Sequence, residues 1–150
     1  MNNTQLEQRL LAMGEKYLPL MASESSEASR ENHWVAPASV DENGEVIINE
    51  NWKCEGGDVY EVIQNHGRLL SMTGDYLALH TVGWACPLID GKEPDVPPSQ
   101  HPDRVRVALL CLVGRDGVFG SVVRIGDQEL MTELDSRGNL RDEALAMFGQ

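Results

Sequence analysis

The sequence predicts one α+β domain, residues 1–150, in which an antiparallel sheet of about four to five strands packs against an N-terminal helix, a middle helix and a short C-terminal helix. Two observations support this class. Segments with helical periodicity stand at both ends and in the middle of the chain. The strands between them are joined by turns too short, or loops too irregular, for parallel crossovers. A chain of 150 residues, 41% of them hydrophobic, is long enough for one core.

The first element is a helix predicted over residues 4–21. Thr4 and Glu7 have the spacing of a capping box. Gly14 is expected to weaken the middle of the helix, and Pro19 to end or kink it. Its apolar side chains recur at helical spacing, so this face must pack on the sheet or on a second copy of the chain. They include Leu6, Leu10, Met13 and Tyr17.

Residues 23–32, SESSEASREN, are polar and have no apolar period, which predicts a linker or a mobile loop, or a segment swapped between subunits together with the first helix. Two strands follow, on either side of residues 41–44, DENG. An Asn-Gly pair between apolar runs is typical of a tight hairpin whose two central residues have positive φ. Pro37 has no N–H to donate, so the first of these strands is expected at an edge of the sheet.

The middle helix is expected to begin after Asp58, with Glu61 as the reciprocal capping partner, and to stop at Gly67. The glycines at 56 and 57 precede this helix, as glycines do in phosphate-binding loops. Their spacing matches no phosphate-binding motif and acidic residues surround them, so we expect no anion there.

The segment YLALHTVGW, residues 76–84, alternates as a strand with apolar residues on both faces, which predicts an inner strand. Leu77 and Leu79 are expected to face a helix. Gly83 is expected to bend the strand so that Trp84 covers the end of the core. A long, proline-rich surface loop is predicted at residues 89–103.

The segment from Arg104 to Gly126 predicts two strands joined by a three-residue turn, with Gly117 in the left-handed position of a bulged turn. The register that gathers the bulky apolar residues on one face pairs Val113 with Phe119, Cys111 with Ser121, Leu109 with Val123, and Val107 with Ile125. The chain closes on a short helix that Asn139 is expected to cap. Its apolar stripe comprises Leu140, Ala144, Leu145 and Phe148.

Composition excludes several classes. The net charge of −12 and the pI of about 4.6 argue against nucleic-acid binding, which depends on Lys and Arg displacing counterions. No apolar run approaches the roughly 20 residues of a membrane helix, and the N-terminus is too polar for a signal peptide, so a cytoplasmic location is predicted. The three cysteines are outside any C-x-x-C pattern, which indicates neither a disulfide framework nor a zinc site. No cofactor and no metal is predicted.

The run TVGWACPL, residues 81–88, is followed by a proline-rich loop ending in HPDRVRV and by a closing GNLRDEALAMFG. This pattern resembles small uncharacterised actinobacterial proteins with a Gly-Trp-Ala-x-Pro-Leu segment. The resemblance covers about residues 77–149. It implies a cytoplasmic bacterial protein and brings no activity, cofactor or catalytic residue with it.

Five residues are candidates for a ligand site. Tyr76, His80 and Trp84 share one strand face, where an imidazole among aromatic rings could act as a general base or hold a polar group of a ligand. The alternative is a core histidine. Cys86 and His101 would lie at the rim of such a site. Catalysis by Cys86 is not predicted, because nothing in its local sequence lowers the pKa of the thiol, and no catalytic motif is recognised elsewhere.

Charge is unevenly spread. Between Asp41 and Glu61 there are seven carboxylates and one lysine, which predicts a solvated face, a docking surface for a basic partner, or a mimic of nucleic acid. Basic residues concentrate near the C-terminal strands, as solubilising charges or as a surface that pairs with the acidic block of a second copy. They are Arg104, Arg106, Arg115 and Arg124.

Three functions follow as hypotheses. The preferred one is a non-catalytic binding or accessory protein that acts through protein–protein contacts as a homodimer. The second is a small-ligand pocket or a cofactor-free enzyme around His80 and Trp84. The third is an acidic mimic of nucleic acid.

Overall fold

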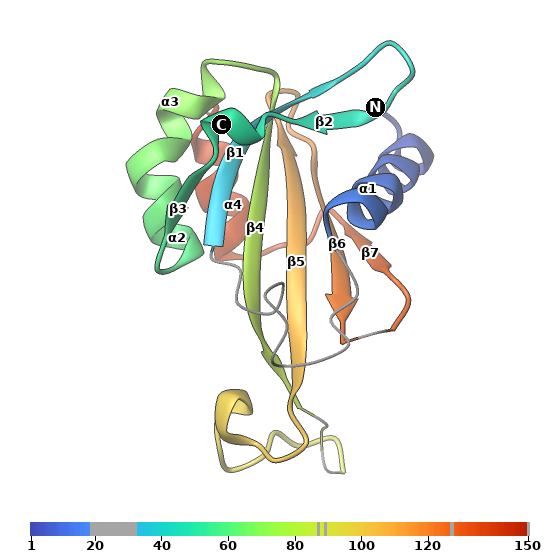
Figure 1. The fold of residues 1–150 in the computed structure, drawn as a ribbon, viewed down its shortest axis with the longest axis vertical. Coiled ribbons are helices and arrows are strands. Elements are labelled where there is room, and N and C mark those ends of the chain that lie inside the picture. Colours follow the sequence, from blue (N-terminus) through green and yellow to red (C-terminus); the bar gives the residue numbers. More distant parts are fainter. Residues whose placement is uncertain (19–32, 87, 89, 127, 150) are drawn as a thin grey trace.

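A curled antiparallel sheet of seven strands runs through the part of the chain that the structure describes, with helices on both of its faces (Figure 1). The computed structural model describes residues 1–18, 33–86, 88, 90–126 and 128–149. The order across the sheet is β2, β1, β4, β5, β6 and β7. β3 lies on the same side of β1 as β2, and it pairs with residues 33–35 of β1 whereas β2 pairs with residues 38–40. None of the helices in these residues is long and apolar enough to cross a membrane.

The strands are β1 (His33–Val40), β2 (Val46–Ile48), β3 (Cys54–Gly56), β4 (Tyr76–Ala85), β5 (Val105–Gly114), β6 (Phe119–Ile125) and β7 (Met131–Leu134). The helices are α1 (Asn3–Tyr17), α2 (Val59–Val62), α3 (Arg68–Ser71) and α4 (Asn139–Ala146). The α+β class is confirmed, but the prediction of four to five strands was too low. The additions are β3 and β7, which are too short to show alternation among polar neighbours.

Both predicted helix caps at the ends of the chain are displaced. The capping box of α1 is formed by Asn2 and Gln5, not by Thr4 and Glu7, because asparagine is a better cap than threonine. At the other end, α4 follows Gly138, so the residue predicted as its cap is the first helical residue. α1 ends at Tyr17, with Leu18 as its C-cap, whereas the helix was predicted over residues 4–21. Residues 19–21 of that prediction and the predicted linker fall in residues 19–32, outside the described residues.

Two glycines let α1 approach the sheet closely. A Cβ atom at Gly14 would lie 2.9 Å from side-chain atoms of Val122 and Leu130, and one at Gly120 of β6 would lie 2.7 Å from Leu10. Gly14 therefore has a packing role as well as a cost in helix propensity. The apolar stripe of α1 enters the core as predicted, through Leu6, Leu10 and Met13.

The turns at Asp41–Glu45 and Gly114–Val118 share one geometry. In each, a three-residue loop ends in a glycine with positive φ, 80° at Gly44 and 84° at Gly117. The expectation that Asn43 also has positive φ is wrong. The carboxylate of Asp41 accepts the N–H of Asn43 at 2.9 Å and favours a turn with a single left-handed glycine. The predicted register of the later hairpin is confirmed at all its pairs.

β1 is an inner strand, so the prediction that Pro37 marks an edge is wrong. Pro37 pairs with Leu77 of β4, and its carbonyl accepts the N–H of Asn49 on the opposite side. Because the N–H and C=O of a strand residue point to the same side, the N–H that proline lacks would face the interval between β2 and β3. Proline therefore costs no hydrogen bond with β4.

β4 is an inner strand, as predicted, and pairs with β1 and β5. Leu77 and Leu79 pack with apolar side chains of α2, α3 and α4, which confirms that they face helices. Gly83 marks no bulge. Its pairing with β5 continues one for one through Gly83, and a Cβ atom there would meet nothing within 4 Å.

Residues 59–71 form one helical segment in which a π-helical turn joins α2 to α3. Asp58 caps it as predicted, since its carboxylate accepts the N–H of Glu61 at 3.0 Å. The expectation that Gly67 ends the helix is wrong. A Cβ atom at Gly67 would lie 2.8 Å from Met147, so this glycine admits the residue that follows α4.

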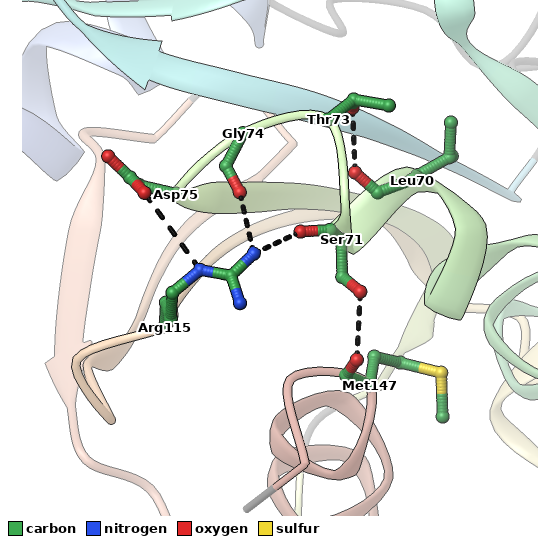
Figure 2. Close-up of polar contacts among 7 residues, drawn as sticks. All are labelled: Leu70, Ser71, Thr73, Gly74, Asp75, Arg115 and Met147. Atoms are coloured by element: carbon green, nitrogen blue, oxygen red, sulfur yellow. Dashed lines mark hydrogen bonds and ion pairs between the residues drawn. The ribbon is translucent and has the colours of Figure 1, made fainter.

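Arg115, in the turn between β5 and β6, joins three elements (Figure 2). Its Nη2 donates to the carbonyls of Ser71 and Gly74 at the end of α3. The hydroxyl of Ser71 in turn donates to the carbonyl of Met147, at 2.8 Å, after the end of α4. The guanidinium also lies 5.2 Å from the ring centroid of Phe148. A cation at helix C-terminal carbonyls is favourable, so Arg115 has a structural role.

We expect Gly120→Val to lower the free energy of unfolding by about 1 to 3 kcal/mol, because the added side chain overpacks the contact with α1. Gly83→Val is the matched control, because it makes the same change inside a strand where an added Cβ atom would have no neighbour within 4 Å. Urea unfolding compares them, and equal effects of the two substitutions would show that the close approach of α1 is unimportant.

Candidate functional site

The five residues predicted for a ligand site do not converge. Tyr76, His80 and Trp84 share one face of β4, as alternation predicts, but successive members are four residues apart, about 13 Å along a strand. Cys86 and His101 lie beyond the Trp84 end of the strand. The structure therefore brings only Trp84 near the segment that carries Cys86 and His101.

Tyr76 lies at the end of β4 that adjoins the turn between β5 and β6. It borders a shallow hollow with Asp75, Arg115 and Asp116. Burial, and then the negative charge of Asp116, raises the pKa of the Tyr76 phenol. The phenol is therefore protonated at neutral pH and serves as a hydrogen-bond donor.

His80 is enclosed in the core. It is 1% exposed, and its ring stacks on that of Trp34, its cross-strand neighbour in β1, with centroids 5.1 Å apart and planes inclined by 8°. This environment is that of a packed core histidine. In this conformation the ring presents no open face to a ligand.

Cys86 lines a cavity of about 480 Å³ whose wall continues through Ala85, Leu88 and the loop at residues 93–98. His101 does not line it. The Nδ1 atom of His101 instead accepts the N–H of Asp103 at 3.0 Å. The thiol and the imidazole thus belong to separate surroundings.

The residues that do gather around Trp84 are arginines. Arg106 is its cross-strand neighbour in β5, and the Cζ atom of Arg106 lies 4.7 Å from the centroid of the indole. Arg104, which lies just before β5, places its Cζ atom 4.9 Å from the same centroid. Each guanidinium is attracted to the electron-rich face of the ring. The indole of Trp84 thus contacts two cations.

Arg124 extends this group across β5. It pairs with Ala108, which makes it the diagonal neighbour of Arg106 on the same face of the sheet. Arg124 is 6% exposed, and its Nη1 and Nη2 atoms donate to the carbonyls of Gln128 and Leu18 at 3.0 and 3.2 Å. We call Trp84, Arg104, Arg106 and Arg124 the arginine–tryptophan cluster.

The cluster has an excess of positive charge in a chain of net charge −12. Among the described residues, neither Arg106 nor Arg124 forms an ion pair with a carboxylate, and the buried Nε atom of each has no hydrogen-bond partner. Buried guanidinium nitrogens without partners are costly. The positive charge of these side chains gives the surface a potential that attracts anionic groups.

Sequence reasoning recognised the concentration of arginines but did not place them beside Trp84. It also expected Trp84 to cover the end of the core, whereas the indole is partly exposed and lies between cations. The alternation of Arg104 and Arg106 was visible in the sequence. Their contact with Trp84 was not, because it depends on how β4 and β5 pair across the long loop between them.

No protein-family model, no curated protein and no solved structure matches this chain. The resemblance to actinobacterial proteins therefore remains a hypothesis from the sequence. In the residues that the structure describes, no group of three or more His, Cys, Asp or Glu side chains is placed to hold a metal ion.

We expect Trp34→Ala to cost about 3 to 5 kcal/mol of stability, because Trp34 is buried in the stack with His80. Trp84→Ala should cost about 1 to 2 kcal/mol, because Trp84 is only partly buried and lies outside both core clusters, with two cation–π contacts. Thermal or urea unfolding of the two variants measures the difference. A cost at Trp84 as large as that at Trp34 would restore the prediction of a core tryptophan.

Burial raises the pKa of Cys111 to about 12 from its ordinary 9.0. The thiol ionises at a lower pH in the unfolded chain than in the folded one. Its contribution to the free energy of unfolding is therefore fully present below about pH 9 and is lost as the pH rises toward 12. We expect the free energy of unfolding to fall by about 2 kcal/mol between about pH 8 and pH 10.5 through this thiol. Cys111→Ala should flatten this dependence and Cys54→Ala should not, as measured by urea unfolding at both values.

Proposed function

We propose that the protein is a non-catalytic binding protein that acts through protein–protein contacts, with the arginine–tryptophan cluster as its docking surface for an acidic segment. The observation that carries this proposal is the absence of a carboxylate partner for Arg106 and Arg124 among the described residues, in a chain with twice as many acidic as basic residues. The proposal retains the cytoplasmic location predicted from the sequence.

The partner that we propose is a second copy of this chain. Glu55 pairs with Trp34 and therefore lies on the face of the sheet that carries the cluster, whereas Asp58 and Glu61 follow at the start of α2, which packs on the opposite face. In a two-fold dimer, each contact is made twice. The arginines of each copy would then meet carboxylates of the other, and the two contacts would reinforce each other.

The other two functions have less support. The acidic block divides between the β1–β2 turn and the segment from β3 to α2, which lie at opposite ends of β1. A mimic of nucleic acid needs carboxylates along one continuous face. A ligand pocket around His80 and Trp84 would need residues that the structure places about 13 Å apart along β4.

Sedimentation velocity at micromolar concentration tests the proposed dimer. We expect Arg106→Glu to weaken self-association by about tenfold or more, because it replaces an attraction with a repulsion. Glu55→Lys, at an exposed position of β3 that caps no helix, should weaken it similarly, and mixing these two variants should restore association. Arg137→Glu, which makes the same charge change at an exposed position after β7, is the control. A wild-type chain that is monomeric at every concentration, in low salt as well as high, would refute the dimer.

A further inference from the structure

A further hollow, separate from the one that Tyr76 borders, lies at the Tyr76 end of β4, away from the arginine–tryptophan cluster. It has a volume of about 560 Å³, and it is formed where β1, β2 and the turn before β4 meet the 3₁₀ turn Glu50–Trp52. This volume is within the range of small-molecule sites. None of its lining residues belongs to the arginine–tryptophan cluster, so the two surfaces are separate.

Trp52 is the prominent side chain of this hollow. It is 52% exposed, which is unusual for the largest apolar side chain and is not explained by any contact with the core. The backbone around it is fixed, since the N–H of Trp52 donates to the carbonyl of Asn49 at 3.1 Å and the N–H of Asn49 donates to that of Pro37 at 2.9 Å. The indole is therefore presented on a preformed turn.

The remaining polar lining is neutral apart from one carboxylate. It supplies hydroxyl, carboxamide and carboxylate groups from Ser39, Asn49, Glu50, Asn51 and Thr73, all of them exposed. Within the described structure, the side chains of Ser39, Asn49, Glu50 and Asn51 make no hydrogen bond to the protein, so their donors and acceptors are available. The lining described by the structure includes no Lys, Arg or His.

These features select one class of ligand. Without a cation, the hollow does not favour phosphates or carboxylates. A wide-open hollow does not enclose a wholly apolar molecule either. A neutral saccharide is neither anionic nor wholly apolar. Its C–H face can lie on the indole, and its hydroxyl groups can exchange hydrogen bonds with carboxamides and donate to the Glu50 carboxylate. We propose that the Trp52 hollow is a binding site for a neutral saccharide.

Nuclear magnetic resonance of the ¹⁵N-labelled indoles tests this site. The chain has three tryptophans, and the spectrum of Trp52→Phe identifies the signal of Trp52. The probes are maltotriose, cellotriose, xylotriose, mannotriose and chitotriose, with glucuronic acid and inorganic phosphate as anionic comparisons. We expect at least one neutral trisaccharide to give a saturable shift of the Trp52 indole, and neither anion to do so.

Variants then separate direct contact from a general effect. Because Trp52→Ala removes the indole signal, isothermal titration calorimetry with the trisaccharide that binds measures the affinity of the variants. We expect Trp52→Ala to weaken the binding by about tenfold or more and Asn51→Ala to weaken it by about threefold, whereas Trp84→Ala should leave it unchanged. The proposal is overturned if no neutral trisaccharide produces a saturable shift up to tens of millimolar. It is also overturned if binding survives Trp52→Ala, or if the anions shift the Trp52 signal equally.

Discussion

The ten-residue pairing of β4 with β5 is the constraint on which the rest of the structure depends. It aligns two strands without a bulge, so every side chain of β4 is assigned to one of two faces. On one face, Leu77 and Leu79 meet the helices α2, α3 and α4; on the other, Ala78 and His80 enter the core that α1 shares.

The pairing of β4 with β5 also sets Trp84 beside Arg106 at one end and Tyr76 beside Gly114 at the other. The two proposed binding surfaces are separated by the length of this strand.

Much of the fold was predictable because short-range rules determine it. The register of β5 and β6 followed from a three-residue turn and from the need to keep bulky side chains on one face, and every predicted pair is present. The inner position of β4 followed from its two apolar faces. Long-range packing accounts for the errors. From the local sequence, Gly67 predicts the end of a helix and Pro37 predicts an edge strand. Instead, Gly67 is explained by its contact with Met147, and Pro37 by the interval between two short strands on one side of β1.

The candidate sites were less predictable than the fold. Alternation correctly put Tyr76, His80 and Trp84 on one face, yet a shared strand face does not make a pocket when its members are far apart along the strand. Burial on this face of β4 is complete at His80 and only partial from Val82 onward, so Trp84 lies outside the core that the sequence assigned to it. Trp52 stands between polar residues with no apolar period. Its exposure became evident only when β1, β2 and the turn before β4 were assembled around it.

The arginine–tryptophan cluster is difficult to explain by stability alone. Taking a guanidinium out of water is costly unless charge and hydrogen bonds compensate for it. Arg124 recovers part of this cost through the carbonyl of Leu18, at the negative end of the α1 dipole, and through the carbonyl of Gln128. Neither carbonyl carries a full charge, and Nε has no partner in the described structure. An apolar side chain at this position would fill the same space without that cost, as replacements of buried ionic groups in other proteins have shown. In the proposed dimer, the buried charge of Arg124 would add to the positive potential that the partly exposed Arg104 and Arg106 present to the acidic surface of the second copy.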